Sequence, residues 1–184
     1  VKQAAKKADP SQPKSQQVDT PANARALVDA AIKDDSARFE TILADLRRNP
    51  APDSGDSRIA RKLNDAALMA LREKNYAQAI DALQKAVAAD AADIEAANNL
   101  GYALHLAGQY REAEEQLLRV IAQSPDRAAA WANLATTSSK LGKSRQAVAA
   151  YLIAYKFQRE PERFLEALKR LSESSDEEAV KKDI

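Results

Sequence analysis

Residues 100–125 read LGYALHLAGQYREAEEQLLRVIAQSP, and the same order of small, apolar and turn residues recurs on both sides of this stretch. Ala113 has counterparts 34 residues away in each direction, at Ala79 and Ala147. Further pairs at this spacing are Leu100 and Leu134, Gly108 and Gly142, Tyr76 and Tyr110, and Ala97 and Trp131. A fixed period of about 20–50 residues is typical of repeat proteins, in which each copy is one small structural unit.

Each copy is predicted to form two helices, because apolar and small residues follow helical spacing twice per period. Small residues such as Gly101 and Ala113 allow the two helices to cross closely, and larger residues fill the space between copies. Gly108 and Gly142 suit the left-handed residue that ends the first helix of a copy. This pattern resembles the tetratricopeptide repeat.

The resemblance implies an all-α, right-handed superhelical solenoid. Its three helix-turn-helix repeats would occupy 60–161, divided into 60–93, 94–127 and 128–161. The composition agrees, because Ala, Leu, Lys, Arg, Glu and Gln are strong helix formers. The second repeat matches the family pattern best. The first has Lys74 at the turn and Ala91 at its end, and the third has Ser144 and Arg159 at two family positions.

The segments outside the repeats have different compositions. We expect a flexible tether over 1–20, an N-terminal helical hairpin over 21–48, a linker over 49–59, and a capping helix with a frayed tail over 162–184. The hairpin lies outside the repeat spacing, because one period before Ala79 lies the charged Asp45. Its second helix should begin near Ser36. The final helix carries an apolar stripe of Phe164, Leu165, Leu168 and Leu171 opposite a charged face.

Several classes of function are disfavoured. The chain has no cysteine and one histidine, His105, so neither a multi-histidine metal site nor a thiolate site is expected. Its four glycines form no phosphate-binding loop. A net charge of +1 argues against a nucleic-acid partner, and no apolar run is long enough to span a membrane. We expect no enzyme activity and no cofactor.

A binding function follows from the resemblance, since the first helices of tetratricopeptide repeats line a concave groove that usually takes a peptide. By position, the groove would present Arg61, Asn64, Leu68, Arg72, Asn98, Asn99, Tyr102, His105, Asn133, Thr136, Ser139 and Lys140. The asparagines have two interpretations: contacts to a peptide main chain, or features of the repeat itself. Tyr102 is the aromatic residue expected as an anchor.

One known function of the family is disfavoured. Repeats that grip the acidic C-termini of heat-shock chaperones use a clamp of two lysines, one arginine and two asparagines. The corresponding residues here are Asn64, Leu68, Asn99, Ala129 and Asn133, of which Asn99 alone matches.

Charge is distributed unevenly. Residues 127–159 contain no acidic residue, and Lys143 and Arg145 form a basic patch there, whereas 95–126 is mainly acidic. This pattern is explained either by packing between repeats or between stacked molecules, or by an acidic partner of the third repeat.

We expect a scaffold or adaptor that holds a protein or peptide partner in the groove. One alternative is a secretion chaperone or assembly subunit that dimerises through the N-terminal hairpin. Another is an autoinhibited groove that is occupied by residues 1–20 or by the hairpin. The Ala-rich repeats and the tether are typical of bacterial envelope proteins. Because the chain begins at Val1, we expect a processed product, with the periplasm slightly favoured over the cytoplasm.

Overall fold

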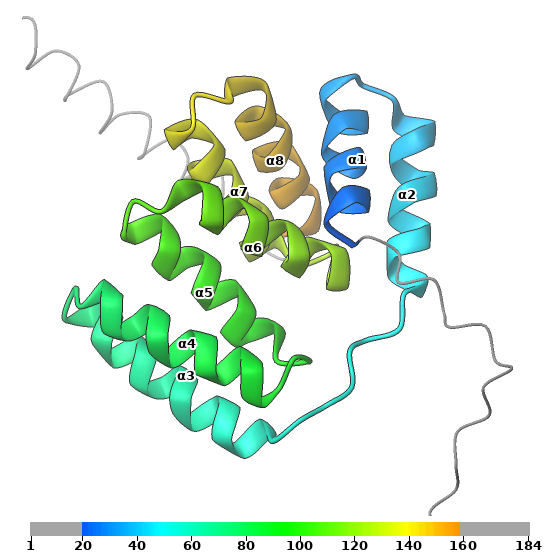
Figure 1. Cartoon of the computed structure of the whole chain (residues 1–184). Coiled ribbons are helices and arrows are strands. Elements are labelled where there is room, and N and C mark those ends of the chain that lie inside the picture. The colour runs from blue at the N-terminus through cyan, green and yellow to red at the C-terminus, as the bar shows by residue number, and fades with distance from the viewer. Residues whose placement is uncertain (1–19, 159–184) are drawn as a thin grey trace, which may run out of the picture.

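The computed structural model describes residues 20–158. Within this range the chain forms eight helices and no strand (Figure 1). They are α1 (Thr20–Ile32), α2 (Ser36–Arg48), α3 (Ser57–Arg72), α4 (Tyr76–Ala89), α5 (Ile94–Leu106), α6 (Tyr110–Gln123), α7 (Ala128–Lys140) and α8 (Ser144–Phe157). The all-α prediction is confirmed. The predicted tether, except for its last residue, and the predicted capping helix over 162–184 lie outside the described residues.

Helices α3 to α8 form three successive hairpins that stack side by side (Figure 1). The first helices α3, α5 and α7 are neighbours, and each second helix packs on the first helix of the next hairpin. Gly101 shows why small residues are needed, since a Cβ atom there would lie 2.7 Å from the Leu117 side chain. Ala79 and Ala113 are fully buried for the same reason.

The turn within each hairpin has the same backbone conformation. Gly108 and Gly142 have φ angles of 77° and 73°, as expected, and Lys74 occupies the same place in the first repeat with a φ of 59°. Asp34 has a φ of 55° in the turn between α1 and α2. The N-terminal hairpin therefore has the turn of a repeat, although it lies 40 residues before Lys74 and not 34.

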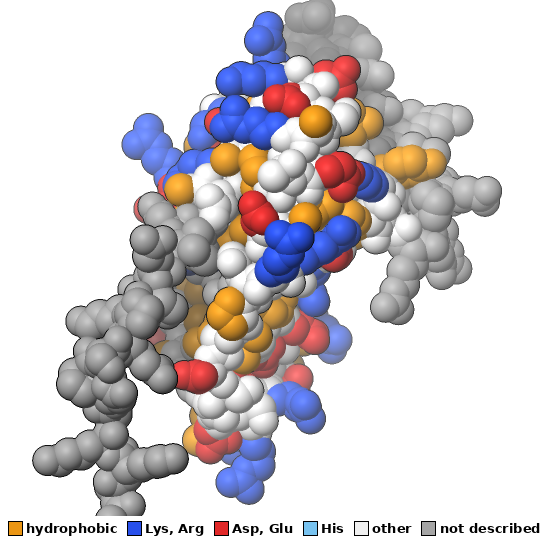
Figure 2. Space-filling view, turned by 90° about the vertical axis from the view of Figure 1, so that its right-hand side faces the viewer, with side chains coloured by type: hydrophobic (Ala, Val, Ile, Leu, Met, Phe, Trp, Pro, Cys, Tyr) orange, Lys and Arg blue, Asp and Glu red, His pale blue; other side chains and the backbone are white. Residues whose placement is uncertain are grey.

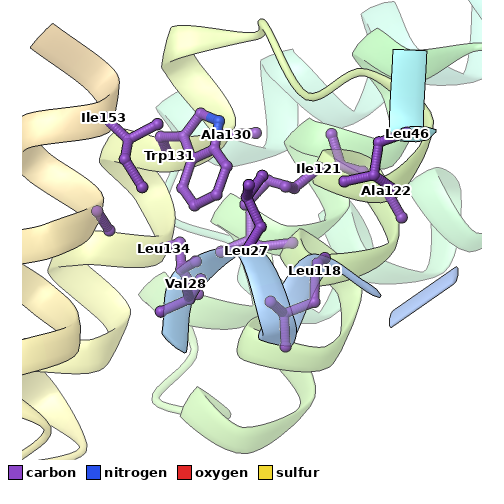
Figure 3. Packing of buried hydrophobic residues seen from close by; sticks show 14 of the residues in the cluster. Leu27, Val28, Leu46, Leu118, Ile121, Ala122, Ala130, Trp131, Leu134 and Ile153 are labelled. Atoms are coloured by element: carbon purple, nitrogen blue, oxygen red, sulfur yellow. The ribbon is translucent and has the colours of Figure 1, made fainter. Parts of the chain in front are cut away.

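The N-terminal hairpin does not stack on α3, the helix that follows it in the sequence. Instead α1 packs against α6 and α8, on the side of the solenoid formed by the second helices. In Figure 3, Leu27 and Val28 of α1 lie among Leu118, Ile121 and Trp131. These residues belong to the larger of the two hydrophobic clusters, so the hairpin is part of the core of the second and third repeats.

Ion pairs tie the hairpin to the repeats. Arg25 pairs with Glu115, Arg47 with Asp126 at 2.6 Å, and Lys156 with Glu40 at 2.5 Å. All six side chains are about half exposed, so each pair contributes at most about 1 kcal/mol. Their main effect is to specify which surface of the repeats the hairpin contacts. They also show that acidic residues of the second repeat have basic partners within the chain.

Hydrogen bonds hold the second half of the linker between α2 and α3 against the end of α4. The buried Asp90 accepts hydrogen bonds from the backbone N–H groups of Gly55 and Ala92, both at 3.0 Å. The N–H of Asp56 donates to the carbonyl of Ala89 at 2.8 Å. A Cβ atom at Gly55 would lie 2.0 Å from that carbonyl oxygen, so the linker reaches α4 only because residue 55 is glycine.

Figure 2 shows side chains of both charge signs scattered among polar and hydrophobic ones, on the face that lies at the right in Figure 1. None of the helices within residues 20–158 combines the length and the apolar character needed to cross a bilayer.

Candidate functional site

The candidate site is the surface formed by α3, α5 and α7, which we call the A-helix surface. Hydrogen bonds join neighbouring helices here, between Asn99 and Asn64 and between Asn133 and Asn98. Of the residues predicted to line it, Arg61, Arg72, Tyr102, Ser139 and Lys140 are exposed, while Leu68, Asn99, His105, Asn133 and Thr136 are half-buried. Asn64 and Asn98 are buried.

The four asparagines form a ladder between repeats. The Asn99 side-chain amide donates to Asn64 Oδ1 at 2.9 Å, and the Asn133 amide donates to Asn98 Oδ1 at 3.3 Å. Asn64 and Asn98 are 6% and 5% exposed, so they offer a partner almost no surface and act in packing. The Oδ1 atoms of Asn99 and Asn133 accept no hydrogen bond from another residue within 20–158.

His105 lies beside this ladder and contacts Thr137 of α7. Its Nδ1 is 3.0 Å from Thr137 Oγ1, and the Thr137 hydroxyl donates its proton to the Asn133 carbonyl at 2.7 Å. With the Thr137 proton directed to that carbonyl, Nδ1 of the neutral ring donates to the hydroxyl. Burial, and then the charge of Lys140, lower the pKa of His105 from 6.5, so the ring is neutral at pH 7.

Tyr102 is the exposed aromatic residue of α5, with 41% of its surface accessible. It lies between Asn99 and His105 at steps of three residues, so these three side chains follow one stripe of the helix. The Thr136 hydroxyl donates to the carbonyls of Asn133 and Ala132 at 2.9 and 3.3 Å. Its proton is therefore already used within α7.

A polar recess of about 350 Å³ lies at the start of α3 and α5. Its lining is mostly acidic and consists of Ser57, Arg61, Asn64, Asp65, Asp90, Asp93 and Glu95. Asp93 caps α5 by accepting from the Ala96 N–H, and Asp90 holds the linker, so two of the carboxylates have structural roles. No group of three or more potential metal ligands is found among residues 20–158.

One of the two residues of the predicted basic patch, Lys143, forms an ion pair within the chain. Lys143 binds both carboxylate oxygens of Glu114, at 2.8 and 2.6 Å, and Gln146 donates to the same carboxylate. Glu114 is 8% exposed, so this pair links the second and third repeats from within. Packing between repeats thus accounts for Lys143, while Arg145 stays exposed with no ion-pair partner in the described range.

The hairpin does not occupy the A-helix surface. It packs on α6 and α8, which are second helices, so the expectation that the hairpin lies in its own groove is corrected. The physical reason is that α6 presents Leu118 and Ile121, which need an apolar cover that α1 supplies. The other version of that hypothesis, with residues 1–20 in the groove, lies outside the described residues apart from Thr20.

Sequence reasoning missed two exposed apolar residues at the start of the solenoid, Ile59 and Met69, which are 47% and 62% exposed. Ala103 and Thr137 occupy the place of Met69 in the later repeats and are fully buried by the repeat before them. Met69 has no such cover, because the hairpin packs elsewhere. The sequence feature that could have indicated this exposure is the long linker, which allows the hairpin to pack away from α3.

Comparison with known proteins agrees with this architecture. Residues 70–137 match the sequence model of the tetratricopeptide repeat family. No curated protein matches the sequence. Among solved structures, the first such domain of Spaghetti (RPAP3), bound to the HSP90 peptide SRMEEVD, is 18% identical with a TM-score of 0.58 and covers 68% of this chain and 99% of its own.

Two other solved structures are similar. The Sgt2 domain from Aspergillus fumigatus is 22% identical with a TM-score of 0.56, covering 70% of this chain and 88% of its own. The Yersinia enterocolitica type III secretion translocator chaperone SycD is 19% identical with a TM-score of 0.58, covering 70% and 98%. Residues 70–137 therefore match the tetratricopeptide repeat in sequence, and the described part of the chain has the fold of that family.

Proposed function

We propose that the protein is a non-catalytic interaction module that holds a segment of a partner protein on the A-helix surface. One observation carries the proposal: Asn99 and Asn133 each have an unoccupied side-chain acceptor, the two are spaced by one repeat, and the exposed Tyr102 is one turn from Asn99 on α5. Such acceptors can receive main-chain N–H groups of an extended peptide without reading its sequence.

Specificity would come from other residues of the A-helix surface. Tyr102 and Leu68 offer an aromatic and an aliphatic contact, and exposed aromatic residues often dominate binding energy. Arg72 and Lys140 would favour acidic side chains on the partner. The RPAP3 domain binds an HSP90 peptide, but none of the clamp positions in this chain carries a charged residue. We therefore propose a partner other than a chaperone C-terminus.

The test is selection of binding peptides from a random library, followed by affinity measurement on variants. Tyr102→Ala should weaken binding about tenfold or more, because truncating an aromatic anchor usually costs over about 1.4 kcal/mol. Asn99→Ala should weaken binding less, by removing one acceptor. Gln84→Ala, on the exposed side of α4, is the control and should bind normally. Equal affinity of all variants would show that the A-helix surface is not used.

A role in a bacterial secretion or envelope assembly is the finer version of this proposal, supported by the similarity to the chaperone SycD. A dimer through the apolar side of the hairpin is disfavoured, since Leu27, Leu43 and Leu46 are at most 1% exposed within one chain. Proteins that carry the selected peptide motif should then be secretion or envelope components. A motif found only in unrelated cytosolic proteins would contradict this assignment.

A further inference from the structure

The last described helix, α8, exposes an apolar stripe on the side of the solenoid where the hairpin lies. Val148 and Leu152 are one turn apart and are 59% and 65% exposed. One repeat earlier, the residue in the place of Leu152 is Leu118, which is 1% exposed in the cluster that includes α1. Two repeats earlier it is the polar Gln84. An apolar residue at this position thus indicates a covering helix.

The stripe borders a groove between α8 and the turn that joins α1 to α2, which lie side by side in Figure 1. Two adjoining recesses, of about 210 and 520 Å³, share Ala31, Asp34, Ala149 and Leu152. The apolar lining is completed by Ala30, Ile32, Phe39, Val148 and Ile153. This groove is separate from the A-helix surface.

The rims of the groove carry opposite charges. Asp34 lies on the rim formed by the N-terminal hairpin, and Arg145 lies on the rim formed by α8. Neither side chain has a hydrogen bond or an ion pair with another residue in the described part of the chain. The groove is therefore suited to an amphipathic helix that carries both charge signs beside an apolar stripe.

We propose that residues 161–171 of this chain occupy the groove as a helix antiparallel to α8. The segment PERFLEALKRL has Phe164, Leu165, Leu168 and Leu171 at helical spacing, with Glu162, Arg163, Glu166, Lys169 and Arg170 on its other side. Only residues 158–160 separate it from the end of α8, a usual length for the connection between antiparallel helices.

The lengths also agree. Eleven helical residues span about 16 Å, and α8 with 14 residues spans about 21 Å, so the segment can run back past Leu152 toward Val148. With Leu165 opposite Leu152, Lys169 would lie one turn further along, level with Val148 and Ala149, where Asp34 also lines the groove. The C-terminal segment would then join the third repeat to the N-terminal hairpin, rather than only closing the end of the solenoid.

Paired cysteines test this placement without background, because the full chain contains no cysteine. The pair Leu152→Cys and Leu165→Cys should form a disulfide under mild oxidation, since residues 152 and 165 would face each other. The matched control is Gln84→Cys with Leu165→Cys, which places the first thiol at the same position two repeats earlier. Both partners on the described helices are exposed, so the fold should tolerate the changes.

The product identifies the occupant. A cross-linked monomer from the Leu152 pair, with little from the Gln84 pair, is the expected result. A cross-linked dimer would overturn the proposal by showing that a second copy fills the groove. Free thiols in both variants, or equal cross-linking in both, would overturn it by showing that the segment does not dock there. Circular dichroism of both variants checks that they are folded.

Discussion

Lys74 holds a backbone conformation for which the other repeats use glycine. Its φ of 59° is in the left-handed region, where a Cβ atom is unfavourable, and Gly108 and Gly142 hold the same turn position at 77° and 73°. We expect Lys74→Gly to raise the free energy of unfolding by about 0.5–1 kcal/mol. Urea unfolding followed by circular dichroism measures the change.

The neighbouring residue supplies the control. Glu73 has a φ of −80°, which any residue adopts, so Glu73→Gly should lower stability, by about 0.5–1 kcal/mol, through the entropy of the unfolded chain. A loss of stability in both variants would contradict the argument from the turn.

His105 makes stability depend on pH in a defined direction. Because burial and then Lys140 lower its pKa from 6.5, the unfolded chain takes up this proton before the folded chain as the pH falls. The contribution of the neutral His105 ring to the free energy of unfolding is fully present above about pH 6.5 and declines below it. The loss of unfolding free energy between about pH 7 and pH 5 should therefore be smaller in His105→Gln than in the wild type.

Urea unfolding at the two pH values measures this difference. Carboxylates titrate in both proteins, so their contribution cancels in the comparison. The same pH dependence in both proteins would show that His105 is not held neutral by its surroundings.

At the scale of helices, the sequence predicted the repeat hairpins well. Residues at a constant spacing report contacts between successive hairpins, so Gly108 and Gly142 predicted the turns, and Ala79 and Ala113 predicted the close crossings. The asparagines show the limit. The hydrogen bond between Asn99 and Asn64 can be predicted only when the packing of α5 against α3 is known. Their separation of 35 residues is equally consistent with two side chains that each contact a bound peptide.

The N-terminal hairpin shows a second limit. Its second helix near Ser36 was predicted from the sequence, and its separation from the repeats was predicted from the charged Asp45 one period before Ala79. Its packing on α6 and α8 was not, because no local pattern encodes contacts between residues such as Lys156 and Glu40, which are 116 positions apart. The division of the chain into domains at 20, 48, 59 and 161 stays a prediction.

For the whole molecule, we expect the hairpin and the repeats to unfold together. Leu27 is fully buried in the cluster that contains Trp131, the single tryptophan of the chain. Leu27→Ala should lower the free energy of unfolding by about 2–5 kcal/mol, because it leaves a cavity in that core. Tryptophan fluorescence during urea unfolding reports the change from within the third repeat.

Asp29→Ala, on the exposed side of the same helix, is the control and should change stability by less than about 0.5 kcal/mol. A fluorescence midpoint that does not move in Leu27→Ala would mean that the repeats are stable without the hairpin.

The return of α1 onto α6 and α8 has a consequence for folding order. In an ordinary solenoid each unit contacts only its neighbours, so folding can spread from one unit to the next during synthesis. Here the N-terminal hairpin docks on helices that are made some 90 residues or more after it, as the contact of Arg25 with Glu115 shows. The hairpin cannot complete its packing until α8 has been synthesised, and its apolar side is exposed to other proteins until then.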